Sequence, residues 1–142
     1  IAIRVKRECF ILAQREVISI QKTIDEGKNW NNQSSGMTIH SGADFIFIDE
    51  EIGFINDYGL AGMNGENSGL LVTNNGGKSF LKVKIELDGL KRDTQLYIND
   101  VPYKEGNILK VQTYIIEQSK KKYYYFYSED NGLNWKIESE KE

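Results

Sequence analysis

The sequence has few of the residues that build covalent links or metal sites. Its 142 residues include one proline, one cysteine and one histidine. Cys9 has no second cysteine with which to form an internal disulfide, and His40 alone cannot supply a histidine-rich metal site. The sequence therefore predicts no metal and no cofactor. Cys9 is expected to be a buried structural thiol, because a free cysteine behaves mainly as a small hydrophobic residue.

Long hydrophobic runs and an excess of positive charge are also missing. No apolar stretch approaches the roughly 18 residues that span a bilayer, so membrane insertion is not expected. The net charge is -3, whereas nucleic acids and anionic membranes attract basic surfaces. A nucleic-acid partner is therefore not expected either. The hydrophobic fraction of 39% and the charged fraction of 27% are typical of one folded globular domain.

One eight-residue frame occurs three times. It consists of a hydroxyl residue, an Asx two positions later, a glycine after two more, and an aromatic residue three further on. The residues are Thr23, Asp25, Gly27 and Trp30; Thr73, Asn75, Gly77 and Phe80; and Ser128, Asp130, Gly132 and Trp135. A β-rich run precedes each frame, glycine tolerates positive φ, and an Asx side chain can accept hydrogen bonds from turn amides. Each frame therefore predicts a hairpin turn, and we call residues 23–30, 73–80 and 128–135 the repeat turns.

The repeat turns closely resemble the Asp-box, or BNR repeat, whose pattern is Ser/Thr-x-Asp-x-Gly-x-Thr/Ser-Trp/Phe. Asp-boxes occur in sialidases, sortilin-type receptor domains, xyloglucanases and photosystem II assembly factors, nearly always as the outer hairpin of a β-propeller blade. Three departures are small: Asn75 replaces the Asp, and Asn29 and Asn134 replace Thr or Ser. The resemblance implies structural roles for the frame residues, turns that face solvent, and an extracytoplasmic or cell-surface location.

The strand pattern predicts an all-β fold of about three antiparallel, propeller-like blades in a single domain, 1–142. The repeat turns begin at residues 23, 73 and 128, a blade-sized spacing, which places the blades at approximately 1–36, 37–92 and 93–142. Closed propellers have about four to eight blades. Three blades would therefore need a second copy of the chain or further blades upstream of Ile1, unless the sheets form a compact arrangement that is not a propeller.

Within the first predicted blade, residues 1–5 and 9–13 are expected to form two strands joined near 6–8, with a helix as the alternative. Residues 31–36 are expected to form a polar loop, because all six are polar or glycine. A glycine-rich connection is expected at 58–69.

The most aromatic stretch directly follows three lysines. Alternation along a strand places Tyr123, Tyr125 and Tyr127 on one face, and Tyr124 and Phe126 on the other. Mixed basic and aromatic residues can bind single-stranded nucleic acid. Because the net charge is negative, a charged hairpin tip followed by a core strand is the simpler interpretation. If the rings have a binding function, a carbohydrate platform is favoured.

Two other motifs are better explained as structure. Residues 76–79, Gly-Gly-Lys-Ser, resemble part of a phosphate-binding loop, but Val72 occupies the position of its first glycine and no helix is predicted to follow. The Asx residues of the repeat turns lack the run of alternating acids ended by a distant Glu that an EF-type calcium loop requires.

These observations favour a non-catalytic binding or assembly module for a protein or carbohydrate ligand. The alternative is part of a sialidase-like or other glycoside hydrolase propeller. Sialidase chemistry, as the resemblance implies it, needs three substrate-binding arginines, a Tyr and Glu pair and an acidic residue, and this set is not recognisable here. A two-carboxylate glycosidase is harder to exclude. Its candidate acids are Asp44, Asp49, Glu50, Glu51 and Asp57.

Overall fold

The computed structural model describes residues 2–11, 14–57, 68–83, 85, 95–98 and 101–141. These residues form twelve β-strands, all paired antiparallel, so the predicted all-β class is confirmed. None of them forms a helix long and apolar enough to cross a membrane. The side chain of Cys9 and most of the connection predicted at 58–69 lie outside the described part.

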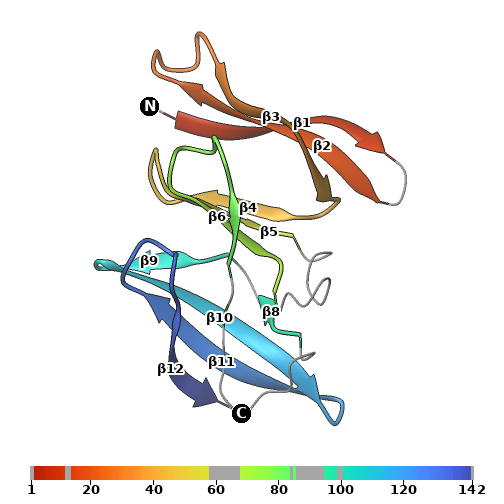
Figure 1. Ribbon diagram of the computed structural model, residues 1–142, viewed down its shortest axis with the longest axis vertical. Helices are drawn as coiled ribbons and strands as arrows, with labels where there is room; N and C mark the ends of the chain where they lie inside the picture. Colours follow the sequence, from red (N-terminus) through yellow and green to blue (C-terminus); the bar gives the residue numbers. More distant parts are fainter. Residues whose placement is uncertain are drawn as a thin grey trace.

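The strands form three separate sheets in chain order (Figure 1). The first sheet contains β1 (Ala2–Ile11), β2 (Arg15–Thr23) and β3 (Asn31–His40). The second contains β4 (Asp44–Phe47), β5 (Gly53–Asn56), β6 (Leu70–Thr73) and β7 (Leu81–Lys82). The third contains β8 (Tyr97–Ile98), β9 (Tyr103–Glu105), β10 (Ile108–Glu117), β11 (Lys120–Ser128) and β12 (Lys136–Lys141).

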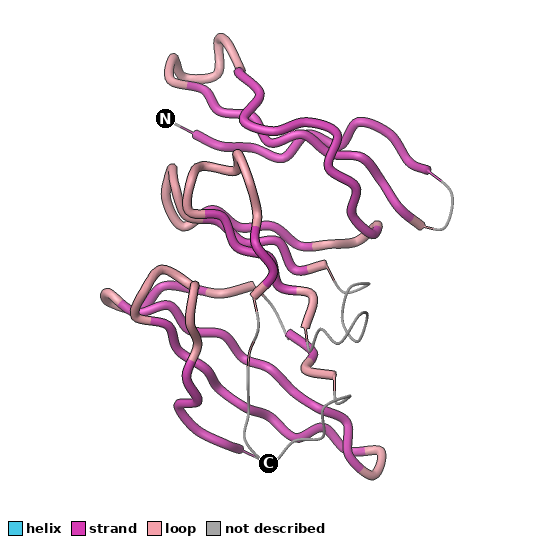
Figure 2. The backbone as a smooth tube through the Cα atoms, viewed as in Figure 1, coloured by secondary structure: helices cyan, strands magenta, loops and turns pink. Residues whose placement is uncertain are grey.

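The sheets are stacked along the long axis of the molecule, with an apolar core in each of the two interfaces. Between the first and second sheets lie Ile18, Ile20, Ile39, Ala43 and Ile55. Between the second and third lies a larger cluster that includes Phe54, Leu70, Val72, Tyr124 and Phe126. Within the described residues the sheets do not close into a barrel or ring. The three repeat turns lie along the same side of the stack (Figure 2).

Strand β1 corrects the prediction of two short strands. The chain pairs with β2 continuously from Ala2 to Ile11, and the register shifts between Arg7 and Cys9. Glu8 is therefore the extra residue of a β-bulge, which lets one strand continue where the apolar pattern changes phase. The break in the pattern marked a bulge and not a turn.

Strand β3 corrects the prediction of a polar loop. Residues 31–36 pair with β2, with register irregularities around Ile20, and 37–40 continue the same strand. Polar side chains are compatible with a strand because the ladder bonds come from the backbone, and only one face must be apolar. The strand also crosses the predicted blade boundary at 36, so residues 37–40 belong to the first sheet and the second sheet begins at Asp44.

Candidate functional site

The three repeat turns close with the same hydrogen bonds. In the third turn, Ser128 Oγ accepts bonds from the amides of Gly132 (2.9 Å) and Asp130 (3.4 Å) and donates to Asp130 Oδ1 (2.8 Å). The hydroxyls of Thr23 and Thr73 make the equivalent contacts at 2.8 to 3.3 Å. One hydroxyl in each turn therefore satisfies two amides that the sheet cannot pair.

A second layer of bonds joins each Asx to the residue four positions later. In the first turn, Asp25 Oδ1 accepts from the amide of Asn29 (2.8 Å), and Oδ2 accepts from its side-chain nitrogen (2.7 Å). Asp130 and Asn134 repeat these contacts at 2.9 and 2.6 Å.

In the second turn the side-chain polarity is reversed. Asn75 Oδ1 still accepts from the amide of Ser79 (3.0 Å), but Asn75 Nδ2 donates to Ser79 Oγ (2.8 Å). In the first and third turns an Asp faces an Asn, whereas in the second turn an Asn faces a Ser. Each turn departs from the Asp-box pattern at one position, and in each turn the two side chains still form a matched donor and acceptor pair.

These bonds stabilise the ionised form of the turn carboxylates. The side-chain bond from Asn29, followed by its amide, lowers the pKa of Asp25 below the usual 3.8. The same two bonds from Asn134 lower the pKa of Asp130, against a weaker opposing effect of burial. Both carboxylates are therefore ionised acceptors at neutral pH, which suits a structural role and not general acid catalysis.

The glycines of the second and third turns are buried against the preceding sheet. A Cβ on Gly77 would lie 2.4 Å from Ile20 Cγ2 of β2, and a Cβ on Gly132 would lie 2.5 Å from Phe54 Cζ of β5. Both glycines also have positive φ, +90° and +87°. The expectation that the turns face solvent is thus wrong for these two glycines. Gly27 is exposed, and its Cβ position has only Trp30 of its own turn within 4 Å.

The three closing aromatic residues differ in environment. Trp135 is 8% exposed, its Nε1 donates to the carbonyl of Gly132 (2.9 Å), and its ring meets Phe54 edge-on at 6.2 Å between centroids. Phe80 is partly buried beside the core between the first and second sheets. Trp30 is also partly buried, with the Arg4 guanidinium carbon 3.9 Å from the ring centroid. Among the described residues, the second and third turns thus contribute their aromatic residue, Phe80 and Trp135, to an internal core, and the first turn does not.

The candidate glycosidase acids mostly have structural partners. Asp57 is buried and accepts from the His40 amide (3.2 Å), and its Oδ1 lies 2.9 Å from His40 Nδ1. Asp49 accepts from the amides of Glu51 (2.8 Å) and Ile52 (2.7 Å) in its own turn. Glu50 lies 3.8 Å from the ammonium of Lys22. Asp44 and Glu51 are exposed.

The residues considered for phosphate or metal binding belong to the repeat turns. The Gly-Gly-Lys-Ser run at 76–79 belongs to the second repeat turn and leads into strand β7. The part of the chain that the structure describes contains no group of three or more side chains that could hold a metal ion.

Six of the eight tyrosines lie on one face of the third sheet. Directly opposed residues of antiparallel strands project to the same side. One row contains Tyr97, Tyr114 and Tyr123, the next Gln112 and Tyr125, and the last Tyr103, Lys110 and Tyr127. Tyr124 and Phe126 point into the core instead, as the alternation predicts. We call the surface made by Tyr97, Tyr103, Tyr114, Tyr123, Tyr125 and Tyr127 the tyrosine face.

Contacts among these side chains hold the tyrosine face in place. Tyr97 stacks on Tyr114 with 5.3 Å between ring centroids and 18° between planes, and Tyr114 lies 5.9 Å from Tyr123. Lys121 Nζ lies 4.5 Å from the centroid of Tyr114. Gln112 Nε2 donates to the Tyr125 hydroxyl at 2.6 Å. The rings are therefore ordered by their neighbours before any ligand is bound.

Charged residues flank one end of the tyrosine face. Lys110 Nζ lies 3.1 Å from Glu138 and 3.4 Å from Glu105. The hydrogen bond from Lys110 to Glu138 is the main reason that the pKa of Lys110 is raised above the usual 10.5. This end of the face thus carries two carboxylates around one fixed ammonium group.

The sequence located only half of this surface. Tyr123, Tyr125 and Tyr127 follow from alternation in a single strand, but Tyr97, Tyr103 and Tyr114 come from three other strands. Tyr97 and Tyr103 stand on strands of two and three residues, too short for a periodic signal.

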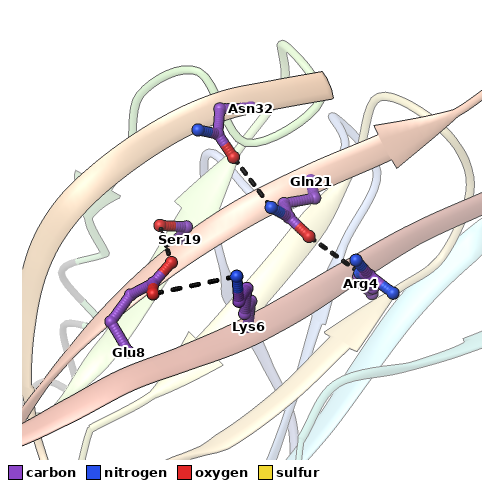
Figure 3. A network of polar contacts seen from close by, with 6 residues as sticks. All are labelled: Arg4, Lys6, Glu8, Ser19, Gln21 and Asn32. Carbon is purple, nitrogen blue, oxygen red and sulfur yellow. Dashed lines mark hydrogen bonds and ion pairs between the residues drawn. The ribbon is translucent and has the colours of Figure 1, made fainter. Parts of the chain in front are cut away.

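The far end of the stack carries a polar surface instead. On the first sheet, Arg4 Nε donates to Gln21 Oε1 (2.8 Å), and Gln21 Nε2 donates to Asn32 Oδ1 (2.9 Å; Figure 3). Ser19 Oγ donates to Glu8 Oε1 (2.9 Å), and Glu8 Oε2 lies 3.9 Å from Lys6 Nζ. We call the surface made by Arg4, Lys6, Glu8, Ser19, Gln21 and Asn32 the polar face. It faces away from the core of the first sheet.

A scan against protein-family models and a comparison with curated proteins find no match to this sequence. Function must therefore be argued from the residues and their contacts. Two surfaces stand out on geometric grounds, the tyrosine face and the polar face.

Proposed function

We propose that this chain is a non-catalytic binding module of the Asp-box propeller type, whose tyrosine face holds a protein or carbohydrate ligand. The observation that carries the proposal is the gathering of six of eight tyrosines on one sheet face. A tyrosine offers an apolar ring and a polar hydroxyl, and it loses little conformational freedom on binding. Tyrosine is accordingly enriched at protein interfaces.

The repeat turns act as scaffold in this proposal. The three sheets correspond to three blades, and each of the last two turns inserts its glycine against the blade before it. The hydroxyl and Asx side chains of each turn are engaged in bonds within that turn. Ligand binding is therefore assigned to the sheet face and stability to the turns.

The environment of the acids supports a non-catalytic role. A two-carboxylate glycosidase needs a general acid and a second carboxylate flanking one substrate site. Asp49 and Asp57 bond to backbone amides, and Glu50 lies beside Lys22. These contacts orient the acids toward the protein.

A binding titration tests the proposal. Hexasaccharides of glucose, xylose and N-acetylglucosamine, together with a displayed peptide library, serve as probes for the wild type and for three variants. Tyr125→Ala removes a ring from the centre of the face, Tyr125→Phe removes only its hydroxyl, and Leu81→Ala removes an apolar side chain that is 62% exposed on the second sheet. The same oligosaccharide mixtures are assayed for new reducing ends.

We expect at least one probe to bind, with affinity at least tenfold weaker for Tyr125→Ala, a smaller loss for Tyr125→Phe and none for Leu81→Ala. No new reducing ends should appear. Binding that all three variants retain would exclude the tyrosine face as the site. Turnover of an oligosaccharide, abolished by replacing two of the candidate acids, would instead support the glycoside hydrolase alternative.

A further inference from the structure

The two faces of each sheet can be told apart by counting residues back from the hydroxyl residue of its repeat turn. Side chains one, three and five residues before the turn hydroxyl point toward the following sheet. Ile20 and Lys22 of the first sheet do so, the former in the core and the latter beside Glu50. In the second sheet, Leu70 and Val72 do so in the next core. We call this side of any sheet the forward face.

Side chains two and four residues before the turn hydroxyl point toward the preceding sheet. Leu71 of the second sheet packs beside the first core, and Tyr124 and Phe126 of the third sheet pack in the second core. We call this side the backward face. The glycine of the turn belongs to it, since Gly77 and Gly132 fit against the forward face of the sheet before.

The two ends of the stack expose one face of each kind. By the same count, Tyr123, Tyr125 and Tyr127 form the forward face of the third sheet, so the tyrosine face occupies the position that receives a repeat turn elsewhere in the molecule. Ser19 and Gln21 lie on the backward face of the first sheet, which is the polar face; both are buried, and the exposed residues of this face are Arg4, Lys6, Glu8 and Asn32.

In the described part of the chain, Gly27 of the first repeat turn does not contact another sheet. Gly27 has φ +88°, close to the values of Gly77 and Gly132, yet it is exposed. Among the described residues, the first repeat turn has no receiving sheet and the tyrosine face receives no repeat turn. Both surfaces carry charges of both signs: Arg4, Lys6 and Glu8 on the polar face, and Lys110 and Lys121 with Glu105 and Glu138 at the tyrosine face, so opposite charges can be brought together.

We propose that the tyrosine face receives the first repeat turn and polar face of a second copy of this chain. This inference rests on the proposed function, because it names a partner for the same surface. The contact is head-to-tail and continues the stacking that the chain uses twice internally. Such a contact forms a ring if its rotation closes and an open array if it does not.

The experiment measures molar mass by light scattering and sedimentation between about 1 and 500 μM. Gly27→Asn places a side chain where the docked turn would meet the tyrosines, but its Cβ has no atom of the same chain closer than 3.9 Å. Gly42→Asn is the matched control: its φ of +89° gives the same backbone strain, with nothing within 4 Å. Tyr125→Ala alters the receiving surface. Circular dichroism and melting curves verify that each variant is folded.

We expect the wild type and Gly42→Asn to rise above the 16.3 kDa monomer mass with concentration. Gly27→Asn and Tyr125→Ala should each self-associate at least tenfold more weakly. Mixed together, these two variants should recover association, because the first keeps an intact tyrosine face and the second an intact turn.

Two results would overturn the inference. A wild type that stays at the monomer mass over the whole range excludes docking of a second copy, whatever the fold of the variants. Association that survives in Gly27→Asn but not in Tyr125→Ala, with no recovery on mixing, means that two tyrosine faces meet each other. Neither result affects the oligosaccharide and peptide titrations, so the proposed function would be judged separately.

Discussion

At the scale of single residues, the repeat turns depend on matched donors and acceptors. Asp130 presents two acceptor oxygens to the amide and side-chain nitrogen of Asn134, whereas Asn75 presents one acceptor and one donor to Ser79. The residue four positions after the Asx thus donates to a carboxylate in the third turn and accepts from an amide in the second. Sequence comparison with the Asp-box pattern detects one departure in each turn, and the bonds show that each departing residue still has a matching partner.

The pairing predicts a loss and its rescue in the third turn. Asp130→Asn places a donor nitrogen opposite the Asn134 side-chain nitrogen, so the free energy of unfolding should fall by about 1 kcal/mol. Adding Asn134→Ser recreates the pair of the second turn and should restore most of the loss. Urea denaturation at pH 7 measures both. A double variant no more stable than Asp130→Asn would show that the side-chain pairing is unimportant.

The same carboxylates predict part of the acid sensitivity. Because the pKa values of Asp25 and Asp130 are lowered in the folded state, the unfolded chain takes up protons first as the pH falls. Their stabilising contribution is complete above about pH 5 and is lost as the pH falls from about 4 through the folded-state values. Between pH 5 and pH 2 the melting temperature of the wild type should therefore fall more than that of Asp25→Asn/Asp130→Asn. Parallel curves for the two proteins would contradict this origin.

At the scale of elements, the second and third repeat turns each pack on the preceding sheet, and the glycine of the turn allows this close contact. Gly132 and Gly42 have nearly the same φ, +87° and +89°, but only Gly132 faces a neighbour. The two positions therefore separate the cost of backbone strain from the cost of collision.

Gly132→Ala should lower the free energy of unfolding by about 1–3 kcal/mol more than Gly42→Ala does. Both alanines are strained at positive φ, and the added methyl group of the former would also lie 2.5 Å from Phe54 Cζ. Thermal and urea unfolding of the two variants give the comparison. Equal losses would mean that the third turn moves away from the second sheet at little cost.

Sequence patterns predicted individual strands better than the way in which the strands pair. Strand β11 and its two faces follow from alternation. Its register was not predicted: in the structure the tight turn at 118–119 sets Glu117 opposite Lys120, which places Tyr114 opposite Tyr123. The bulge at Glu8 and the polar strand β3 were not predictable, since both depend on pairing with β2 and not on local hydrophobicity. Likewise, the short strands that bring Tyr97 and Tyr103 to the tyrosine face have no period of their own.

At the scale of the whole molecule, the three sheets form an open stack with two unlike ends. The repeat in the sequence predicted three similar units, but it could not show which side of each unit is buried. The described contacts settle this: the two internal interfaces are apolar, one end carries tyrosines and the other a polar network. The candidate binding surface is thus a property of the assembled third sheet, because the sequence did not show which of its strands lie side by side.

The separation of scaffold from binding surface is tested most directly by comparing Tyr125→Ala with Asp130→Ala. For each variant, affinity for the best probe from the oligosaccharide and peptide panels is measured alongside the melting temperature. Tyr125→Ala should weaken binding at least tenfold with little change in melting temperature, because its ring lies on the outer face of the sheet. Asp130→Ala should lower the melting temperature and leave affinity nearly unchanged. The opposite result would contradict the assignment. If Asp130→Ala lost binding while keeping the wild-type melting temperature, and Tyr125→Ala bound fully, the ligand would be placed at the turns.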